Sequence, residues 1–308
     1  MKQWQYKKRL HQEGMVLLAT LSAMTLLIPL VYSGMESQRF HLRQVRQELQ
    51  LEVAHRRAES LLDRVVELLV KDGEKNGATD HLNEEWSQPV FFSGGDDETV
   101  SARVEDGNRR WNLNTLRNRD GTINHELHRI LTRLFAREGL SLELLDRLTD
   151  RSPQWDGMMA EEKPPAGTPS PSSAIWQPFH AMEQLLRLPG WNADAVRTLE
   201  PFLTARNGCG HDRLNVNTAS MKTLELLAPD QNWQRVEAYR KGAPLAQVTQ
   251  LEGLGIVLAP GMTKLLATNS VCFVAHIHSR VDAVAANLTV WMVRNRSRVT
   301  ITRMRWDG

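Results

Sequence analysis

"KKRLHQEGMVLLATLSAM" (residues 7–24) joins a basic head to an apolar run, with a single glycine before the run begins. Residues 15–32 carry no charge. A helix over residues 15–35 would be roughly 30 Å long, which matches the hydrocarbon core of a bilayer. Lysines and an arginine precede the run, so the N-terminus is expected in the cytoplasm. The stretch therefore predicts a transmembrane helix with the body of the chain on the other side of the membrane.

Three kinds of N-terminal segment begin with charge followed by apolar residues: a cleaved secretory signal, a permanent anchor, and a peptide cut at the glycine itself. A secretory signal has a shorter apolar region and small residues at its cleavage site, where Tyr32 of "VYSG" (31–34) fits poorly. Hydrophobicity alone does not separate a permanent anchor from a peptide cut at the glycine. The presence of Gly14 favours the peptide cut at the glycine.

The composition limits the classes of function. At 308 residues the chain can hold two modest domains or one domain with an insertion, and its 41% apolar and 24% charged residues are typical of a folded protein. A net charge of +2 is lower than is typical of a dedicated nucleic-acid-binding protein. No nucleophile or metallopeptidase motif is present, so we expect no catalytic residues and no enzymatic activity.

The two cysteines, Cys209 and Cys272, form neither a CxxC pair nor a zinc-binding pattern. An oxidising compartment allows a disulfide between them, which would close a loop of about 60 residues and contribute roughly 4 kcal/mol by chain entropy. The sequence leaves open whether the two residues meet. His276 and His278 share one face of a predicted strand and are interpreted as sheet residues, so no metal site is predicted.

A long amphipathic helix is predicted over residues 38–71, with apolar residues at three- and four-residue spacing and a stop at Gly73. Joined to the membrane segment, it would be kinked at Pro29. Two short strands follow, "QPVFFS" (88–93) and "ETVSARVEDG" (98–107). An anchor with a coiled-coil stalk explains the helix alone, whereas a helix packed on a sheet explains both the helix and the strands.

Three more strands are predicted near the C-terminal end, at residues 270–281, 285–296 and 298–306, where β-branched and aromatic residues partly alternate with polar ones. Strands before and after a helical block indicate one sheet that carries a helical insertion.

Two stretches of the helical block share the form Asn-apolar-Asn-Thr: "RRWNLNTL" (109–116) and "DRLNVNTAS" (212–220). Asn and Thr at a strand-to-helix junction accept hydrogen bonds from free backbone N–H groups and cap the next helix. Both copies are therefore interpreted as structural rather than catalytic.

The rest of the block is predicted to be helical. Two amphipathic helices over residues 124–150 separate at Gly139, and a Pro/Gly/Ser-rich linker follows at 152–173. Residues 179–203 and 248–267 each have the pattern helix, glycine-centred hairpin, helix.

The two hairpins, "LRLPGWN" and "LEGLGIV", look like those of helix-hairpin-helix or SAM-like modules. In DNA-binding members the N–H groups of this hairpin hold a phosphate. This supports an alternative hypothesis, a membrane-anchored periplasmic DNA-binding protein with helix-hairpin-helix modules. Each bound phosphate needs a cation nearby, but the second hairpin offers Glu252, and Lys264 is the nearest base downstream.

The N-terminal stretch resembles the class III signal of type IV pilins and pseudopilins. The resemblance implies that a prepilin peptidase cuts between Gly14 and Met15 and that the new amine of Met15 is methylated. Most members carry Glu at the fifth mature position, where this chain has Ala19. A membrane-buried carboxylate needs a partner, so a member that lacks it resembles the pseudopilin that has no subunit ahead of it and lies at the tip.

Taken whole, the chain resembles the protein K family of minor pseudopilins in type II secretion, through this leader together with "EEWSQPVFF", "WNLNTL", "PFHAMEQLLRLPGWNADAVRTLEPFL" and "LNVNTAS". The resemblance implies an α+β fold: a pilin-like long N-terminal helix packed on an antiparallel sheet, with a large α-helical (SAM-like or helix-hairpin-helix-like) insertion. The expected divisions are a cytoplasmic leader (1–14), a transmembrane half-helix (15–35), the periplasmic helix with the first strands (36–107), the helical insert (108–211), a second SAM-like segment (212–267) and the C-terminal strands (268–308).

For function, the resemblance implies contact rather than chemistry. The chain is expected at the tip of the periplasmic pseudopilus, where it nucleates assembly for the export of folded proteins across the outer membrane. Expected partners are the other minor pseudopilins, the major pseudopilin, the inner-membrane assembly platform and the prepilin peptidase, with residues 15–35 in the inner membrane and no nucleic acid. No cofactor is expected. Calcium in the insert is allowed by resemblance, but the acids there match no ligand spacing: Asp146, Asp150, Asp156, Glu161 and Glu162.

Overall fold

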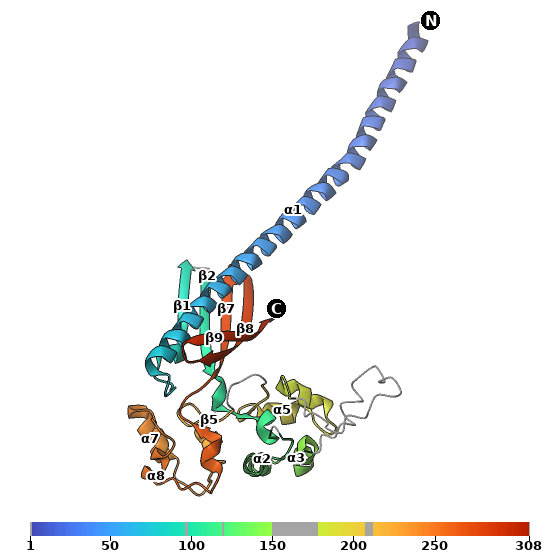
Figure 1. Cartoon of the computed structure of the whole chain (residues 1–308). Coiled ribbons are helices and arrows are strands. Elements are labelled where there is room, and N and C mark those ends of the chain that lie inside the picture. Colours follow the sequence, from blue (N-terminus) through green and yellow to red (C-terminus); the bar gives the residue numbers. More distant parts are fainter. Residues whose placement is uncertain (1, 96–97, 119, 150–177, 207–211, 308) are drawn as a thin grey trace, which may run out of the picture.

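The structure, a computed structural model, describes residues 2–95, 98–118, 120–149, 178–206 and 212–307. Its longest element is helix α1 (Lys2–Asn76), which continues through Pro29. The first part of α1 stands away from the rest of the chain, and the last part lies across a sheet (Figure 1). Contact with the sheet begins near Ala54, and the side chains buried from there share one face of the helix: Ala54, Ala58, Leu61, Leu62, Val65, Leu68 and Leu69.

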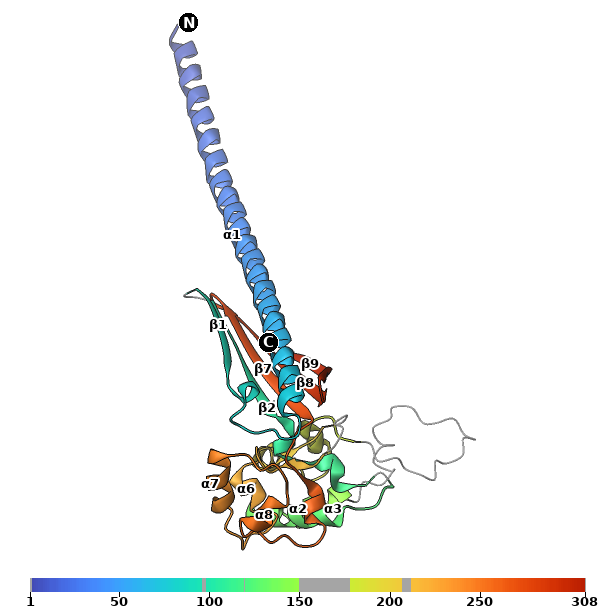
Figure 2. The same cartoon turned by 60° about the vertical axis from the view of Figure 1, so that its left-hand side comes forward.

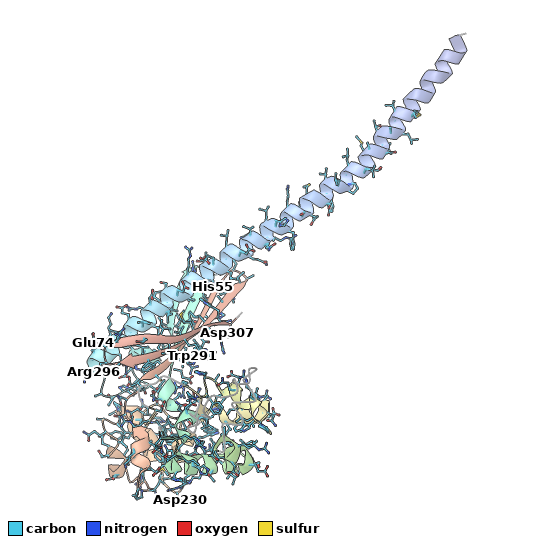
Figure 3. All side chains as sticks on the ribbon, turned by 45° about the vertical axis from the view of Figure 1, so that its right-hand side comes forward. His55, Glu74, Asp230, Trp291, Arg296 and Asp307 are labelled. Carbon is cyan, nitrogen blue, oxygen red and sulfur yellow. The ribbon has the colours of Figure 1, made fainter. Side chains whose placement is uncertain are left out.

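The predicted stop at Gly73 is wrong, because α1 continues to Asn76. A Cβ atom on Gly73 would overlap the backbone carbonyl oxygen of Arg296, in the turn that follows strand β8 (Val284–Asn295). Figure 3 shows Glu74 and Arg296 side by side at this end of the helix. The glycine therefore allows a close approach between helix and turn and does not end the helix.

The sheet has five strands in the order β1-β2-β7-β8-β9, and every neighbouring pair is antiparallel. Its inner face packs against α1 with side chains that include Val104, Phe273 and Val290. These elements confirm the predicted fold class and lie close to the predicted strands. Their bounds are β1 (Val90–Gly95), β2 (Glu98–Asp106), β7 (Cys272–Val281), β8 (Val284–Asn295) and β9 (Arg298–Asp307).

The chain leaves the sheet after β2 and returns at β7, and the helical domain lies between these strands in sequence. In space it occupies the end of the molecule opposite the N-terminus (Figures 1 and 2). One hydrophobic core runs through it from Trp111 to Leu266, so the expected divisions 108–211 and 212–267 share a core. Its α-helices are α2 (His125–Arg137), α3 (Leu142–Thr149), α5 (Ala193–Leu199), α6 (Met221–Leu224), α7 (Gln234–Gly242) and α8 (Gln250–Gly253).

The predicted break at Gly139 is present, with a positive φ of 69° between α2 and α3. The helix-hairpin-helix segments are less regular than predicted. The first limb of one is a 3-10 helix, η4 (Met182–Arg187), and the second limb of the other is a 3-10 helix, η5 (Met262–Leu265). Short limbs are stable here because the shared core buries them, which propensity alone does not reveal.

Each Asn-apolar-Asn-Thr stretch, which we call an echo, begins one module of the helical domain, and in both modules the first strand pairs with the last one. Strand β3 (Trp111–Asn112) pairs in parallel with β4 (Leu203–Thr204), and β5 (Leu214–Asn215) pairs in parallel with β6 (Leu266–Ala267). Each module therefore opens with a strand that carries the first Asn and closes with a strand beside it.

The second Asn of each echo makes the same two-point contact. Asn114 accepts from the backbone N–H of Phe179 (2.7 Å) and donates to its carbonyl (2.8 Å). Asn217 does the same to Leu245, at 2.8 and 3.0 Å. Phe179 and Leu245 each follow a proline, in "PFHAMEQLLRLPG" (178–190) and "PLAQVTQLEGLG" (244–255). The echo is thus part of a longer internal repeat, and its asparagines are structural.

Candidate functional site: the exposed helix face and the interdomain joint

The first surface of interest is the exposed apolar part of α1. From Met15, α1 is the one helix in the described part of the chain that is long and apolar enough to cross a membrane. From residue 35 onward the helix keeps large exposed apolar side chains. Five of them form what we call the spine stripe: Met35, Leu42, Val45, Leu49 and Val53.

The spine stripe faces away from the sheet. At 100° per residue its five side chains fall within an arc of about 80°, and its centre lies about 150° around the helix from the side chains that pack on the sheet. The exposed Phe40 and Leu51 lie on the sheet-facing side instead. The sheet of this chain therefore cannot cover the stripe. Exposed apolar surface of this extent marks a contact with another molecule.

Below Val53 the same face of α1 becomes charged. Arg64 pairs with Glu67 (2.6 Å), and Lys71 pairs with Glu67 (2.5 Å). These bonds lower the pKa of the Glu67 carboxyl, the one from Lys71 most strongly. The outward face of the helix thus changes from apolar to ionic where the sheet begins, so only its upper part offers an apolar contact.

The predicted leader residues all lie on α1. Gly14 lies inside the helix, the Met15 side chain is 75% exposed, and Ala19 is exposed. Cleavage after Gly14 and methylation of Met15 stay predictions.

Cys272 is buried at the start of β7 and is disulfide-bonded. Cys209 lies outside the described residues, and its predicted pairing with Cys272 stays a prediction. The acids at 150, 156, 161 and 162 also lie outside the described residues, whereas Asp146 lies on α3.

A second site is the joint between the sheet and the helical domain, which centres on the buried carboxylate of Asp106 at the end of β2. Ser270, just before β7, donates to it at 2.6 Å, and Thr218 and Asn215 of the second module also donate to it. Burial raises the pKa of Asp106, and the bonds from Ser270 and Thr218 oppose this rise. The first Asn of the second echo therefore ties the helical domain to the sheet.

An ionic cluster completes the joint beside the end of α1. The guanidinium of Arg294, on β8, binds Asp72 of α1 at 2.5 Å and also pairs with Asp80. No signal in the sequence predicts this cluster, because Arg294 is 222 positions from Asp72.

The second hairpin is not arranged to hold a phosphate. Its Gly255 N–H donates to Glu252 (2.9 Å), Ile256 N–H to Leu251 (2.9 Å), and Val257 N–H to the side chain of Gln231 (3.1 Å). A phosphate there would have to replace these bonds. This geometry disfavours the DNA-binding alternative.

The comparison with known families finds a match over part of the chain. Residues 109–208, the first module, match the family model of type II secretion system (T2SS), protein K. This part of the chain is therefore similar to type II secretion protein K, the family that the sequence resemblance predicted. The matched residues include the first Asn-apolar-Asn-Thr stretch, α2 and the first hairpin.

The fold gives a second similarity. The chain is similar to a chain in the crystal structure of the GspK-GspI-GspJ complex from the type II secretion system of enterotoxigenic Escherichia coli. The TM-score is 0.61 at 18% identity, with 86% of this chain and 99% of that chain covered. No curated protein matches the sequence.

Proposed function

We propose that this chain is the minor pseudopilin at the tip of the type II secretion pseudopilus and nucleates its assembly with other minor pseudopilins, for export of folded proteins across the outer membrane. One observation carries the proposal. The apolar stripe of α1 faces away from its own sheet, while the helical domain lies beyond the other end of the same helix (Figure 2).

Both parts of this arrangement suit a terminal subunit. Helices of partner subunits can pack along the spine stripe, because it is apolar and uncovered. The helical domain extends beyond the last turn of α1 and would obstruct a further subunit stacked on that end. Ala19 fits the same position, since a subunit with none ahead of it needs no buried carboxylate there.

The partners follow from the related structure, in which GspK is found in a complex with GspI and GspJ. We extend this composition to the present chain, so that its direct partners are two other minor pseudopilins, followed by the major pseudopilin and the inner-membrane assembly platform. Residues 15–35 hold the chain in the inner membrane until assembly, with the N-terminus cytoplasmic and the body periplasmic. In this proposal the chain acts by binding other pseudopilins and not by catalysis.

The test is co-purification of the full chain with the two other minor pseudopilins. Leu42→Lys combined with Leu49→Lys should weaken the complex at least about 100-fold, because each buried leucine contributes roughly 1.5–3 kcal/mol. Gln47→Lys, an exposed change on the same helix but off the stripe, is the matched control and should leave the complex intact. A complex that tolerates the double lysine variant as well as the control would overturn the proposal.

The leader is tested separately, by mass spectrometry of the membrane-extracted protein. The proposal expects a chain that begins at N-methyl-Met15 after cleavage by the prepilin peptidase. A chain that keeps Met1 would identify a permanent anchor instead.

A further inference from the structure

Three acidic side chains meet where α1 ends. Asp72 lies near the end of the helix, and Asp80 and Glu84 lie in the segment before the 3-10 helix η1 (Glu85–Ser87). One carboxylate oxygen from each of the three lies within 4.8 Å of the others, the one group of this kind among the described residues. Asp80 is fully buried, and Glu84 is 5% exposed.

A single permanent cation faces these acids. Arg294 binds Asp72 and Asp80 from the side of β8. The remaining donors near the aspartates are neutral: Ser270 N–H donates to Asp80 at 2.6 Å, and the Asn76 amide donates to Asp72 at 3.3 Å. Three carboxylates against one guanidinium leave a formal charge of about −2 in a buried place, which is costly without a further cation.

Glu84 holds the atom that lacks a partner. Its Oε2 accepts from the His81 N–H (2.9 Å) and from the indole N–H of Trp86 (2.7 Å). Its Oε1 is buried and has no hydrogen-bond partner among the described residues. The nearest basic group is the His81 ring, whose Nε2 lies 3.6 Å from this oxygen, beyond hydrogen-bond distance. A buried carboxylate oxygen without a donor points to a ligand that is itself positive.

We propose that a divalent cation binds between Asp72, Asp80 and Glu84 and takes the free Oε1 of Glu84 as a ligand. The donor set is oxygen only, which suits hard cations. Ca²⁺ fits best, because it accepts irregular geometry and fills its remaining positions with carbonyls or water, whereas Mg²⁺ demands a regular octahedron. Arg294 keeps its bonds to the two aspartates. The site goes beyond the proposed function and does not depend on it.

A bound cation would compensate the charge of the three carboxylates. It would also join α1 to the segment that carries Asp80, whose carbonyl accepts from Asn215 of the helical domain.

The experiment is thermal unfolding of the full-length chain in detergent at pH 8, after removal of metal with a chelator, with CaCl₂ or MgCl₂ added. Ca²⁺ should raise the Tm saturably, by roughly 5–10 °C at a hundredfold excess over the Kd, and Mg²⁺ should act more weakly. Glu84→Gln keeps the shape and the bond to Trp86, and it should lose the shift. Asp63→Asn, which removes an exposed acid from α1, is the control and should keep it.

Two results would overturn the site: no saturable shift with Ca²⁺ in the unaltered chain, or an equal shift in Glu84→Gln. Should that variant fail to fold, calorimetric titration of the unaltered chain decides. The proposal then expects saturable Ca²⁺ binding to the unaltered chain and weaker binding of Mg²⁺. Absent binding of Ca²⁺ counts against it.

Discussion

Helix α1 has two parts with similar apolar spacing and different solvation. Residues 54–69 bury their apolar face against the inner face of the sheet, where Leu61, Val65 and Leu69 are almost fully covered. Residues 35–53 carry the spine stripe on the opposite face, where its side chains stay exposed in the described part of the chain. The lower part is a core element of the folded subunit, and the upper part is a contact surface. Periodicity marks both as amphipathic, but only the neighbour of each face tells them apart.

The largest expected effect separates the two parts directly. Leu61→Ala in the lower part should reduce the free energy of unfolding by about 2–5 kcal/mol, because it leaves a cavity between helix and sheet. Leu49→Ala in the upper part should change it by less than about 0.5 kcal/mol, since that side chain is 62% exposed. Urea denaturation of the isolated chain in detergent measures both. Equal losses would mean that the upper part is also packed within the subunit.

A second prediction concerns the end of the lower part. Gly73→Ala places a methyl group against the carbonyl of Arg296, so the turn after β8 must move. Alanine favours a helix by about 1 kcal/mol over glycine, but overpacking costs about 1–3 kcal/mol, and we expect a net loss of stability. Gly34→Ala, in the upper part with open space around it, is the control and should not destabilise the chain. A stabilised Gly73→Ala would show that the close approach imposes no constraint.

The third prediction uses pH to probe the same end of the helix. Because the folded-state pKa of Glu84 (about 7) and that of Asp80 (about 6) lie above their usual values, the folded chain binds protons more tightly than the unfolded chain. Without metal, these groups should therefore make the chain less stable as pH rises from about 5 to 8. Glu84→Gln should flatten this dependence in denaturation curves taken across the range. An unchanged slope would contradict the assignment to Glu84.

The smallest expected effect lies at the boundary between the two parts. Arg56 and Glu52 form an exposed ion pair at 2.9 Å, one turn apart on α1. Arg56→Ala should change the unfolding free energy by no more than about 0.5 kcal/mol, because exposed pairs are screened by water and salt. A loss above about 1 kcal/mol in denaturant titrations would show that this pair is more than a screened surface contact.

Much of the architecture was readable from local patterns. The strand predictions at 270–281, 285–296 and 298–306 agree with β7, β8 and β9 within a few residues, because turn residues and alternation bound them. The two echoes were correctly interpreted as structural, since Asn side chains satisfy backbone groups at such junctions. The pairing of the two modules was missed, because "PFHAMEQL" (178–185) and "PLAQVTQL" (244–251) share only a few letters and show their equivalence through the contacts of Asn114 and Asn217.

The role of Gly73 near the end of α1 could not be predicted from the local sequence. A glycine that follows an amphipathic run is a common helix end, and nothing nearby in sequence indicates that the turn at Arg296 needs its space. The ionic cluster at the end of α1 also depends on tertiary structure. Asp72, Asp80 and Arg294 come together only when β8 lies beside the end of α1.

Order along the chain was thus enough to specify a long apolar helix, strands on both sides of a helical block, and paired capping motifs, since each depends on neighbours within a few residues. Folding in three dimensions decided which face of α1 stays uncovered, how closely a turn approaches it, and which carboxylates share one arginine. Those outcomes depend on contacts between residues more than two hundred positions apart, and such contacts leave no periodic trace in a single sequence.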